Sequence, residues 1–589
     1  MFGSRSVGDR CGCWIAELRD AEVSLPCSFE MPWHSIVASR LVPAMQRSEN
    51  RDPIVKHLLP IVSFLWATCT IAFGQQAKDH FDRGAASFQK GNYDDAIESL
   101  SEAIRLDPNL VSAYFNRGVT WAKKGDHDKA IDDYSVAIRL NPKQPSFYNI
   151  RASSWLKKNE FDKAIADYSE VIRLDPNQAL AYYNLAVIWA ESGKRDKAIE
   201  DYTEAIRIDP NLIRAYNNRG LLLSEKGEHD KAIEDLTQAI RLDPKYAPAY
   251  LNRGNAWEQK NEHDKAIDDI SQAIRLNPRP ARGYSDRGFV WSKKDEHDKA
   301  IGDYTEAIRL DPTLTLTFLN RGNSWAEKGD HDKAIDDYTE AIRLDPNHAR
   351  GYYNRAIEYD EKGEHDKAIE DLTQAIRFDP KDALACLNRG NSWAKKRVHD
   401  KAIEDYTEAV RLDPNLALAF INRGHALAER GDYDNAINDF TEAIRLDPDN
   451  SACFFYRGLL WQRKNEYPKA ISDFTTSLRI DPKFPGSLNQ LAWIQATCPD
   501  ADFRNGKQAV LYATKACEQA EWKDASVLNT LAAAYAEAGD FEKALDWQEK
   551  AMNLAPESEK ADYRTRLELY KSRKPYRDEE GVTPPVSLD

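Results

Sequence analysis

Residues 315–348 read TLTFLNRGNSWAEKGDHDKAIDDYTEAIRLDPNH, and similar stretches lie on both sides of them. An Asp-Pro or Asn-Pro pair closes each stretch, and successive pairs are 34 residues apart. The prolines of these pairs are Pro108, Pro142, Pro176, Pro210, Pro244, Pro278, Pro312, Pro346, Pro380, Pro414, Pro448 and Pro482. A constant period of this length indicates stacked repeats, each too small to bury its apolar face alone.

Two amphipathic helices are predicted in each repeat, numbered so that this proline is position 32. Position 8 is Gly or Ala, position 20 is Ala, position 4 is mostly aromatic and position 11 is often Trp. Positions 4, 8 and 11 share one helical face, and positions 20, 24 and 27 share another. Gly125, Asn159 and Gly193, near position 15, are predicted to turn the chain between the helices. The proline ends the second helix because it has no N–H to donate.

This pattern resembles the tetratricopeptide repeat family over residues 77–558. The resemblance implies an all-α fold, a right-handed superhelical α-solenoid of about 14 helix-turn-helix units. The ending also resembles that of bacterial tetratricopeptide proteins, which implies a bacterial source. The predicted segments are twelve regular units in 77–484, a thirteenth with an insertion in 485–524, a fourteenth in 525–558, a capping helix in 559–574 and a disordered tail in 575–589.

The start of the chain carries one apolar run, residues 58–73, which reads LLPIVSFLWATCTIAF. A membrane span needs roughly 20 such residues, so we expect residues 45–74 to be a signal peptide read from Met45 and cleaved at Gly74-Gln75. Residues 1–44 are then a spurious or disordered extension. The alternative is an uncleaved membrane anchor at 58–74. Both interpretations place the repeats outside the cytoplasm, periplasmic or secreted.

Composition excludes several classes of function. The net charge is -15 and the pI is about 5.5, whereas a nucleic-acid binder would show a basic stripe. The eight cysteines form no CxxC pair, so a zinc site is not expected. No phosphate-binding loop, nucleophile elbow or metalloprotease motif occurs, which predicts a protein that is not an enzyme and needs no cofactor.

Histidine recurs at position 17, which raises the question of a metal site. Equivalent positions in adjacent helix pairs are separated by about 10 Å, too far for two imidazoles to hold one metal ion. We therefore expect these side chains to pack at the start of the second helix. They are His127, His229, His263, His297, His331, His365 and His399.

Arginine at position 7 departs from the family pattern, which has a large apolar residue there. A half-buried guanidinium needs a partner, and position 23 supplies Asp in nearly every unit. We predict that the two residues pair within the hairpin or with the next unit. The arginines include Arg117, Arg219, Arg253, Arg321, Arg389 and Arg423, and the aspartates include Asp133, Asp235, Asp269, Asp337 and Asp405.

Asparagine at position 6 is the candidate binding feature. The first helix of each unit lines the concave wall in this family, and a carboxamide offers both a donor and an acceptor to a peptide backbone. The row resembles the asparagine ladder of O-linked N-acetylglucosamine transferases. The candidate residues are Asn116, Asn184, Asn218, Asn252, Asn320, Asn354, Asn388 and Asn422, with apolar position 5 residues Phe115, Tyr183, Leu251, Leu319 and Tyr353.

Two interpretations of this row stay open. Ile150, Asp286 and Tyr456 interrupt it, so a continuous peptide track is not assured, and the carboxamides could instead bond within the solenoid. Positions 5 and 6 carry no basic residues of the kind that a carboxylate clamp requires. The sequence favours binding of some polypeptide by the concave face.

The expected function is a non-catalytic scaffold that binds a protein or peptide partner. One alternative is a subunit related to O-linked N-acetylglucosamine transferase, although only about thirty residues follow the fourteenth unit and the catalytic domain is absent from them. Another is an envelope assembly or secretion factor. No nucleic-acid partner is expected, and membrane contact is expected only through residues 58–74.

Overall fold

The computed structural model describes residues 74–277 and 280–578. Within these ranges the chain is helical and contains no strand. The predictions for residues 1–44 and for the apolar run at 58–73 lie outside the described residues. Among the helices that are described, none combines the length and the apolar character that crossing a membrane requires.

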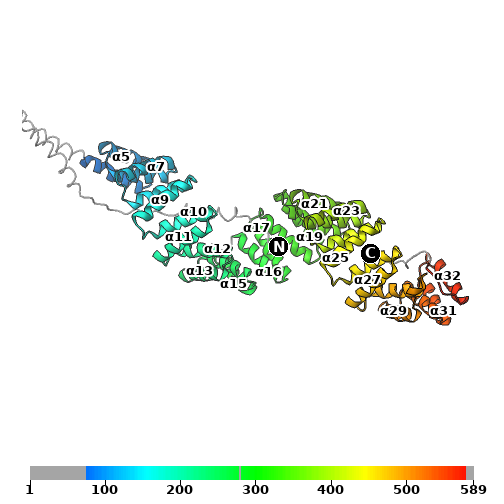
Figure 1. The fold of residues 1–589 in the computed structure, drawn as a ribbon. Helices are drawn as coiled ribbons and strands as arrows, with labels where there is room; N and C mark the ends of the chain where they lie inside the picture. Colours follow the sequence, from blue (N-terminus) through cyan, green and yellow to red (C-terminus); the bar gives the residue numbers. More distant parts are fainter. Residues whose placement is uncertain (1–73, 278–279, 579–589) are drawn as a thin grey trace, which may run out of the picture. The chain divides into compact units, whose positions relative to one another are not determined.

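The chain divides into two compact units, of which the first ends at Lys294 (Figure 1). Residues 74–89 form the first helix of the described part of this unit. The first helices of the following repeats are α6 (Val111–Lys123), α8 (Pro145–Lys157), α10 (Ala179–Glu191), α12 (Ile213–Glu225), α14 (Ala247–Gln259) and α16 (Ala281–Lys293). The second helices are α5 (Tyr93–Leu106), α7 (His127–Leu140), α9 (Phe161–Leu174), α11 (Arg195–Ile208), α13 (His229–Leu242) and α15 (His263–Leu276).

The second unit begins at Asp295. Its first helices are α18 (Thr315–Glu327), α20 (Ala349–Glu361), α22 (Ala383–Lys395), α24 (Ala417–Glu429), α26 (Ser451–Arg463), α28 (Pro485–Thr497) and α30 (Ala525–Glu537). Its second helices are α17 (His297–Leu310), α19 (His331–Leu344), α21 (His365–Phe378), α23 (His399–Leu412), α25 (Tyr433–Leu446), α27 (Tyr467–Ile480), α29 (Gly506–Gln519) and α31 (Phe541–Leu554). A 3-10 turn, η1 (Ala501–Phe503), fills the insertion, and α32 (Lys560–Lys571) follows the last pair.

Close packing inside each hairpin explains the small residue at position 8. A Cβ atom added to Gly322 would lie 2.6 Å from Cε1 of Tyr338, a side chain at position 24 that is 1 % exposed. Ala334, at position 20, is fully buried in the same hairpin. The predicted helix faces are confirmed, since glycine and alanine let the two backbones approach where a larger side chain would not fit.

Position 15 turns the chain between the helices of a pair. Gly329 has φ 73°, in the left-handed region that glycine adopts without a Cβ penalty. Asn159 and Arg397 hold the same conformation with φ 59°. The predicted turn position is confirmed. The Cβ atom of Arg397 makes this conformation less favourable than it is for the glycines.

The segment after α32 differs from the sequence prediction. Residues 575–578 are ordered against α28, where the N–H of Asp578 donates to the carbonyl of Thr497 over 2.9 Å. The prediction of a disordered tail from residue 575 is therefore wrong for these four residues. A buried tryptophan on α28 holds the segment, a long-range contact that repeat periodicity does not encode.

Candidate peptide-binding surface

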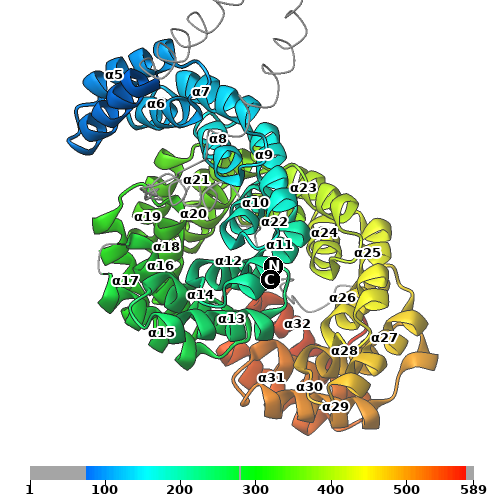
Figure 2. The ribbon, with the colours of Figure 1, turned by 90° about the vertical axis from the view of Figure 1, so that its left-hand side faces the viewer.

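One stripe of side chains runs along each first helix, at positions 2, 6, 9 and 13. Residues spaced by three or four share a helical face, so on α22 the stripe is Leu384, Asn388, Asn391 and Lys395. In the second unit α20, α24 and α26 lie on the inner side of the curve, with α21, α25 and α27 outside (Figure 2). We call these positions on α18, α20, α22 and α24 the inner stripe.

The asparagines at position 6 are bonded to the neighbouring repeat. Six of the eight donate from Nδ2 to a side chain of the preceding repeat. The bonds are Asn184 to Tyr168 Oη (3.3 Å), Asn218 to Tyr183 Oη (3.3 Å), Asn252 to Asn217 Oδ1 (3.0 Å), Asn354 to Asn323 Oδ1 (2.8 Å), Asn388 to Tyr353 Oη (2.8 Å) and Asn422 to Asn391 Oδ1 (2.8 Å). Asn116 and Asn320 are half-buried at the equivalent places.

Position 9 carries a second asparagine row that the sequence reasoning did not single out. Asn391 Oδ1 accepts from Tyr406 Oη over 3.0 Å and from Asn422 Nδ2 over 2.8 Å. Asn323 accepts in the same way from Tyr338 and Asn354, both over 2.8 Å. Each of these oxygens has two lone pairs, so both are fully used within the solenoid.

The position 6 asparagines therefore have both a structural role and spare bonding capacity. Asn218 is only 5 % exposed, and its carboxamide is enclosed by Asn217, Tyr183 and Tyr202, so its role is structural. Asn354 and Asn422 are half-buried, and the bond given for each uses one of its two N–H groups. Their second N–H and their Oδ1 atom are the groups that a peptide backbone would meet.

Position 5 contributes mainly to the core. Tyr183 and Leu319 are 5 % and 3 % exposed, which leaves almost no surface for a ligand, so their prediction as peptide contacts is wrong. Phe115 packs against Phe147, with ring centres 5.1 Å apart. Leu251 and Tyr353 are half-buried and pack against core clusters. The next repeat covers position 5, because successive first helices pack side by side.

Exposed leucines at position 2 are the apolar part of the inner stripe. Leu316, Leu384 and Leu418 are 52 %, 48 % and 49 % exposed, and Arg350 takes the same place on α20. Leu180 on α10 is 58 % exposed. The repeat pattern had not predicted this row. Its signal was a leucine recurring at one repeat position that the core pattern does not use.

Charged side chains of both signs end the inner stripe at position 13. Glu327, Glu361, Lys395 and Glu429 are all exposed there. Along each first helix the side chains of the stripe therefore change from apolar at the start, through carboxamides in the middle, to charged groups at the end. An arrangement of this kind can take an extended segment that has apolar residues on one edge and polar residues on the other.

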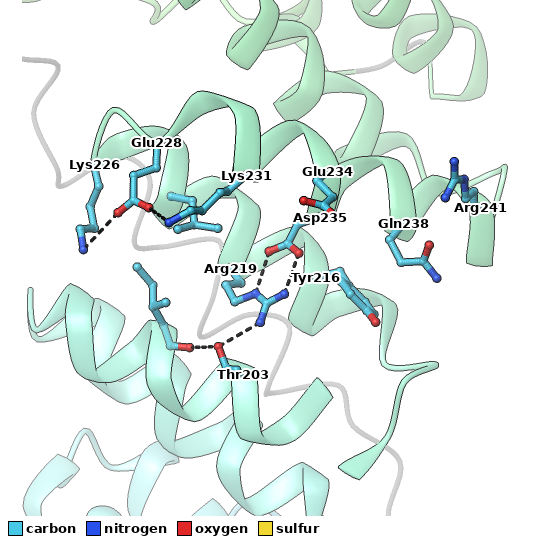
Figure 3. A pocket seen from close by; sticks show the side chains of 12 residues that line it. Thr203, Tyr216, Arg219, Lys226, Glu228, Lys231, Glu234, Asp235, Gln238 and Arg241 are labelled. Atoms are coloured by element: carbon cyan, nitrogen blue, oxygen red, sulfur yellow. Dashed lines mark hydrogen bonds and ion pairs between the residues drawn. The ribbon is translucent and has the colours of Figure 1, made fainter. Parts of the chain in front are cut away.

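Elsewhere on the solenoid, an arginine clip joins consecutive repeats. Arg219 donates from Nε and Nη2 to the two oxygens of Asp235, each over 2.7 Å, and from Nη1 to Thr203 Oγ1 over 2.9 Å (Figure 3). Asp235 belongs to the same hairpin and Thr203 to the preceding repeat. The predicted pairing of positions 7 and 23 is confirmed, and the bond to the preceding repeat adds to it.

The clip recurs with the same atoms along the chain. Burial raises the pKa of the Asp235 carboxyl, and the ion pair with Arg219 opposes that effect. Planar, two-pronged pairs of this kind hold both geometry and charge. The pairs are Arg117–Asp133, Arg151–Asp167, Arg219–Asp235, Arg253–Asp269, Arg321–Asp337, Arg355–Asp371, Arg389–Asp405, Arg423–Asp439 and Arg457–Asp473.

A cavity of about 670 Å³ surrounds the Arg219 clip between α11, α12 and α13. Besides the clip it is lined by Lys226, Lys231 and Glu228, which pair with one another as Figure 3 shows. The charges of these three side chains and of the Arg219–Asp235 pair are compensated within the protein, and Glu234 and Arg241 also line the cavity. We interpret this cavity as the groove between two repeats.

The repeat formed by α10 and α11 lacks the clip, which leaves its position 23 aspartate without an arginine partner in the hairpin. Position 7 of this repeat is Leu185, so Asp201 at position 23 has no guanidinium partner from its own hairpin. Burial raises the pKa of Asp201 to about 6, although the Trp189 side chain hydrogen-bonds to the carboxylate and opposes the rise. This carboxyl is therefore partly protonated near neutral pH.

The candidate metal and thiol residues form no reactive site among the residues described. No group of three or more His, Cys, Asp or Glu side chains in this part of the chain could hold a metal ion. Cys386, Cys453, Cys498 and Cys517 are free and buried. Burial raises the pKa of the Cys386 thiol to about 11, which keeps it protonated and unreactive at neutral pH.

These helix pairs define an α-solenoid of stacked 34-residue hairpins. Matches to family models identify the family to which this solenoid belongs. The model described as TPR repeat matches residues 84–125 and 155–193. A model described as Tetratricopeptide repeat matches 111–144, 179–212, 213–246, 247–280, 316–348, 349–382 and 417–450. A second model with the same description matches 525–558. Together the matches cover more than half of the chain, which belongs to the tetratricopeptide repeat family.

Several solved structures resemble parts of the chain. One is YrrB, described as a TPR protein with an unusual peptide-binding site, at 28 % identity, 31 % of this chain, 95 % of that chain and TM-score 0.28. A tetratricopeptide repeat protein from Parabacteroides merdae ATCC 43184 shows 20 % identity, 42 % and 99 % coverage and TM-score 0.34. The APC/C hetero-tetramer Cut9-Hcn1 shows 16 % identity, 70 % and 95 % coverage and TM-score 0.34. No curated protein matches the chain.

Proposed function

We propose that the protein is a non-catalytic scaffold that binds an extended segment of a partner polypeptide along the inner stripe of α18, α20, α22 and α24. Tetratricopeptide scaffolds are typical of protein–protein interaction. The observation that carries this proposal is the set of leucines at position 2 of α18, α22 and α24, each about half exposed, with Arg350 at the same position of α20. Apolar side chains aligned on one surface and rimmed by polar groups mark interaction sites.

The spacing of the row indicates the conformation of the ligand. Packed helices lie about 8–10 Å apart, so neighbouring repeats present their position 2 side chains at about that interval. A polyproline II segment rises about 3.1 Å per residue and repeats every three residues, which advances about 9 Å per turn. An apolar residue at every third place would therefore meet Leu384 and Leu418 on neighbouring repeats, and Leu316 two repeats before Leu384.

The carboxamides next to this row supply the main-chain contacts. The Oδ1 atom and the second N–H of Asn354 and Asn422 lie one helical turn from the position 2 side chains. A polyproline II segment has no internal hydrogen bonds, so its peptide groups are available to such partners. Backbone recognition of this type reads shape and spacing more than sequence.

Peptides with different apolar spacing test the proposal. Immobilised peptides carry an apolar residue at every second, third or fourth place, with composition held constant, and binding is measured for wild type and for the variant Leu384→Ser with Leu418→Ser. We expect the third-place series to bind best, and the variant to lose at least about tenfold in affinity.

Two other exposed leucines provide a matched control. Leu511 on α29 and Leu554 on α31 are 48 % and 52 % exposed, and both lie on second helices. The variant Leu511→Ser with Leu554→Ser should bind as wild type does. Equal losses in both variants, or equal binding of all three peptide series, would refute the inner stripe as the site.

Export of the scaffold is the second part of the proposal. It rests on the apolar run at 58–73 and on the small residues Ala72 and Gly74 before Gln75. N-terminal sequencing of the exported protein is expected to begin at Gln75. A start upstream of Leu58 would contradict cleavage and favour the anchored form.

A further inference from the structure

The chain reverses direction directly after α32. Arg573 has φ 52°, and the N–H of Lys574 donates to the carbonyl of Leu569 over 2.9 Å. Figure 2 shows α32 on the inner side of the curve, with α29 and α31 on the outer side. Residues 574–578 then run without regular secondary structure to the end of α28.

Residues 576–578 make four kinds of contact with this surface. The N–H of Asp578 donates to Thr497 O over 2.9 Å, and its Oδ2 atom accepts from Trp493 Nε1 over 3.0 Å. Arg577 Nη2 lies 2.7 Å from Glu537 Oε2. The Tyr576 ring packs against Trp493, with ring centres 5.9 Å apart. One main-chain bond, one carboxylate bond, one ion pair and one ring contact are the elements of peptide recognition.

These contacts use repeat positions that also belong to the inner stripe. Trp493 is at position 9 of the thirteenth repeat, equivalent to Asn391 on α22. Glu537 is at position 13 of the fourteenth repeat, equivalent to Lys395. The segment therefore lies along the first-helix surface of the last two repeats, as a bound peptide would.

The surface is held in place by groups that do not belong to the segment. Arg504 Nε lies 3.1 Å from Glu537 Oε1, which orients this carboxylate. Arg566 donates to Asn529 Oδ1 over 3.1 Å, and its guanidinium carbon lies 5.1 Å from the centre of the Trp493 ring. A site whose side chains are fixed by neighbours is preorganised for its ligand.

We propose that Trp493, Thr497 and Glu537 form a second peptide site, whose resting occupant is the chain's own residues 576–578. Its ligand class is an extended segment with an aromatic, a basic and an acidic residue in that order. A partner that carries this order displaces the chain's own segment. The proposal does not depend on the inner stripe, since it uses other repeats and other contacts.

The test compares two forms of the full chain with a labelled peptide of sequence SRKPYRDEE, which corresponds to residues 572–580. In wild type the tethered segment competes at an effective concentration in the millimolar range, so the free peptide binds weakly. In the variant Arg577→Ala with Asp578→Ala the competitor lacks its polar contacts. We expect this variant to bind the labelled peptide at least about tenfold more tightly.

A third substitution identifies the site that binds the peptide. Trp493→Phe keeps an aromatic ring and removes the Nε1 donor, so adding it to the double variant should cancel the gain. Glu537→Gln should reduce binding of this peptide and should have less effect on a peptide with Arg577→Gln. A peptide in which Arg and Asp are exchanged serves as the control and should not bind.

Three results would overturn the proposal. The double variant could bind the peptide no better than wild type, or it could bind the exchanged peptide equally well. The third result combines two measurements: the double variant loses helical circular dichroism, and the single variant Arg577→Ala binds the labelled peptide no better than wild type. The segment would then be a fixed part of the cap. Leu384→Ser with Leu418→Ser should leave this binding unchanged, so the two sites can fail separately.

Discussion

Arg397 holds a backbone conformation that suits glycine better. It occupies position 15 of its repeat with φ 59°, where Gly329 and Gly363 stand in two preceding repeats with φ 73°. A side chain in the left-handed region costs roughly 1 kcal/mol or more, which is partly offset because glycine gains more freedom in the unfolded chain. Packing of the helix pair determines the turn, so Arg397 adopts the left-handed conformation that the turn requires.

Arg397→Gly should therefore stabilise the protein by about 0.5–1 kcal/mol. Chemical denaturation of the full chain, followed by circular dichroism, measures the change. Asn465→Gly, at φ 59°, should give a smaller gain because asparagine tolerates this region. A loss of stability in Arg397→Gly would show that its side chain contributes more than its backbone costs.

Asp201 makes the stability of the protein depend on pH, because its repeat has no arginine at position 7 to pair with it. Its folded pKa of about 6 lies above the ordinary value of 3.8, so the folded state binds the proton more tightly than the unfolded state does. The tighter proton binding by folded Asp201 adds to the free energy of unfolding. This contribution is present in full below about pH 4 and is lost as the pH rises through about 6. At pH 7 the folded protein carries the cost of a partly buried carboxylate.

Asp201→Asn should raise the stability at pH 7 by about 1–2 kcal/mol and flatten the pH dependence between pH 4 and 6. Denaturation midpoints at several pH values measure both effects. The matched control is Asp235→Asn, which deprives Arg219 of its counterion and should destabilise the protein. Stabilisation by both variants would mean that the clip does not compensate burial.

At the scale of the helix pair, the arginine clip ties two elements and two repeats together. Arg355 bonds to Asp371 within its hairpin at 2.7 and 2.8 Å, and to Thr339 of the preceding repeat at 2.9 Å. The Arg355 side chain is 16 % exposed, so it is largely removed from water. Removing one partner of such a pair leaves an uncompensated charge, whereas removing both does not.

Asp371→Ala should cost about 2–4 kcal/mol, and Arg355→Met combined with Asp371→Ala should recover a large part of that loss. Thr339→Val removes only the bond to the preceding repeat and should cost about 0.5–1.5 kcal/mol. Denaturation of the full double-mutant cycle measures the coupling. Additive losses would show that the two side chains act independently.

The sequence predicts the helix pairs well, and predicts their lateral contacts poorly. Gly322 opposite Tyr338, and Arg219 with Asp235, could be predicted because both partners lie in one repeat at fixed spacing. The bond from Asn422 to Asn391 depends on how adjacent repeats stack, which periodicity alone does not give. For the same reason the burial of position 5 and the exposure of position 2 were not predicted.

At the scale of the whole molecule, repeats are interchangeable because their contacts use the same positions. Within the second unit, removing residues 349–382 (α20 and α21) would bring Arg389 beside Thr339 and Asn388 beside Asn323. These are the partners that Arg355 and Asn354 have in the intact chain. Solenoid stability is approximately a sum of repeat and nearest-neighbour terms, so each broken contact is replaced.

Deletion of residues 349–382 should therefore give a soluble protein with unchanged helical signal per residue and a nearly unchanged denaturation midpoint. Circular dichroism and size-exclusion chromatography measure these properties. As a control, deletion of residues 349–365 removes half a period and should disrupt the fold. Aggregation of the first variant would indicate that the repeats are not equivalent.

Three recurring bonds between repeats have the same direction. In the arginine clip, the position 6 asparagines and the lysine pairs the donor lies on the later repeat, as in Arg219 to Thr203, Asn422 to Asn391 and Lys226 to Asp196. The bonds from Arg195 to Glu225 and from Asn255 to Asp286 run the other way. A contact between two copies that reused these three bonds would be head to tail, because a two-fold contact would set their donors against donors. Head-to-tail contacts continue into filaments unless they close into a ring. Arg566 of α32 donates to Asn529 in the same direction, so α32 covers the acceptor edge of α30 against a further copy.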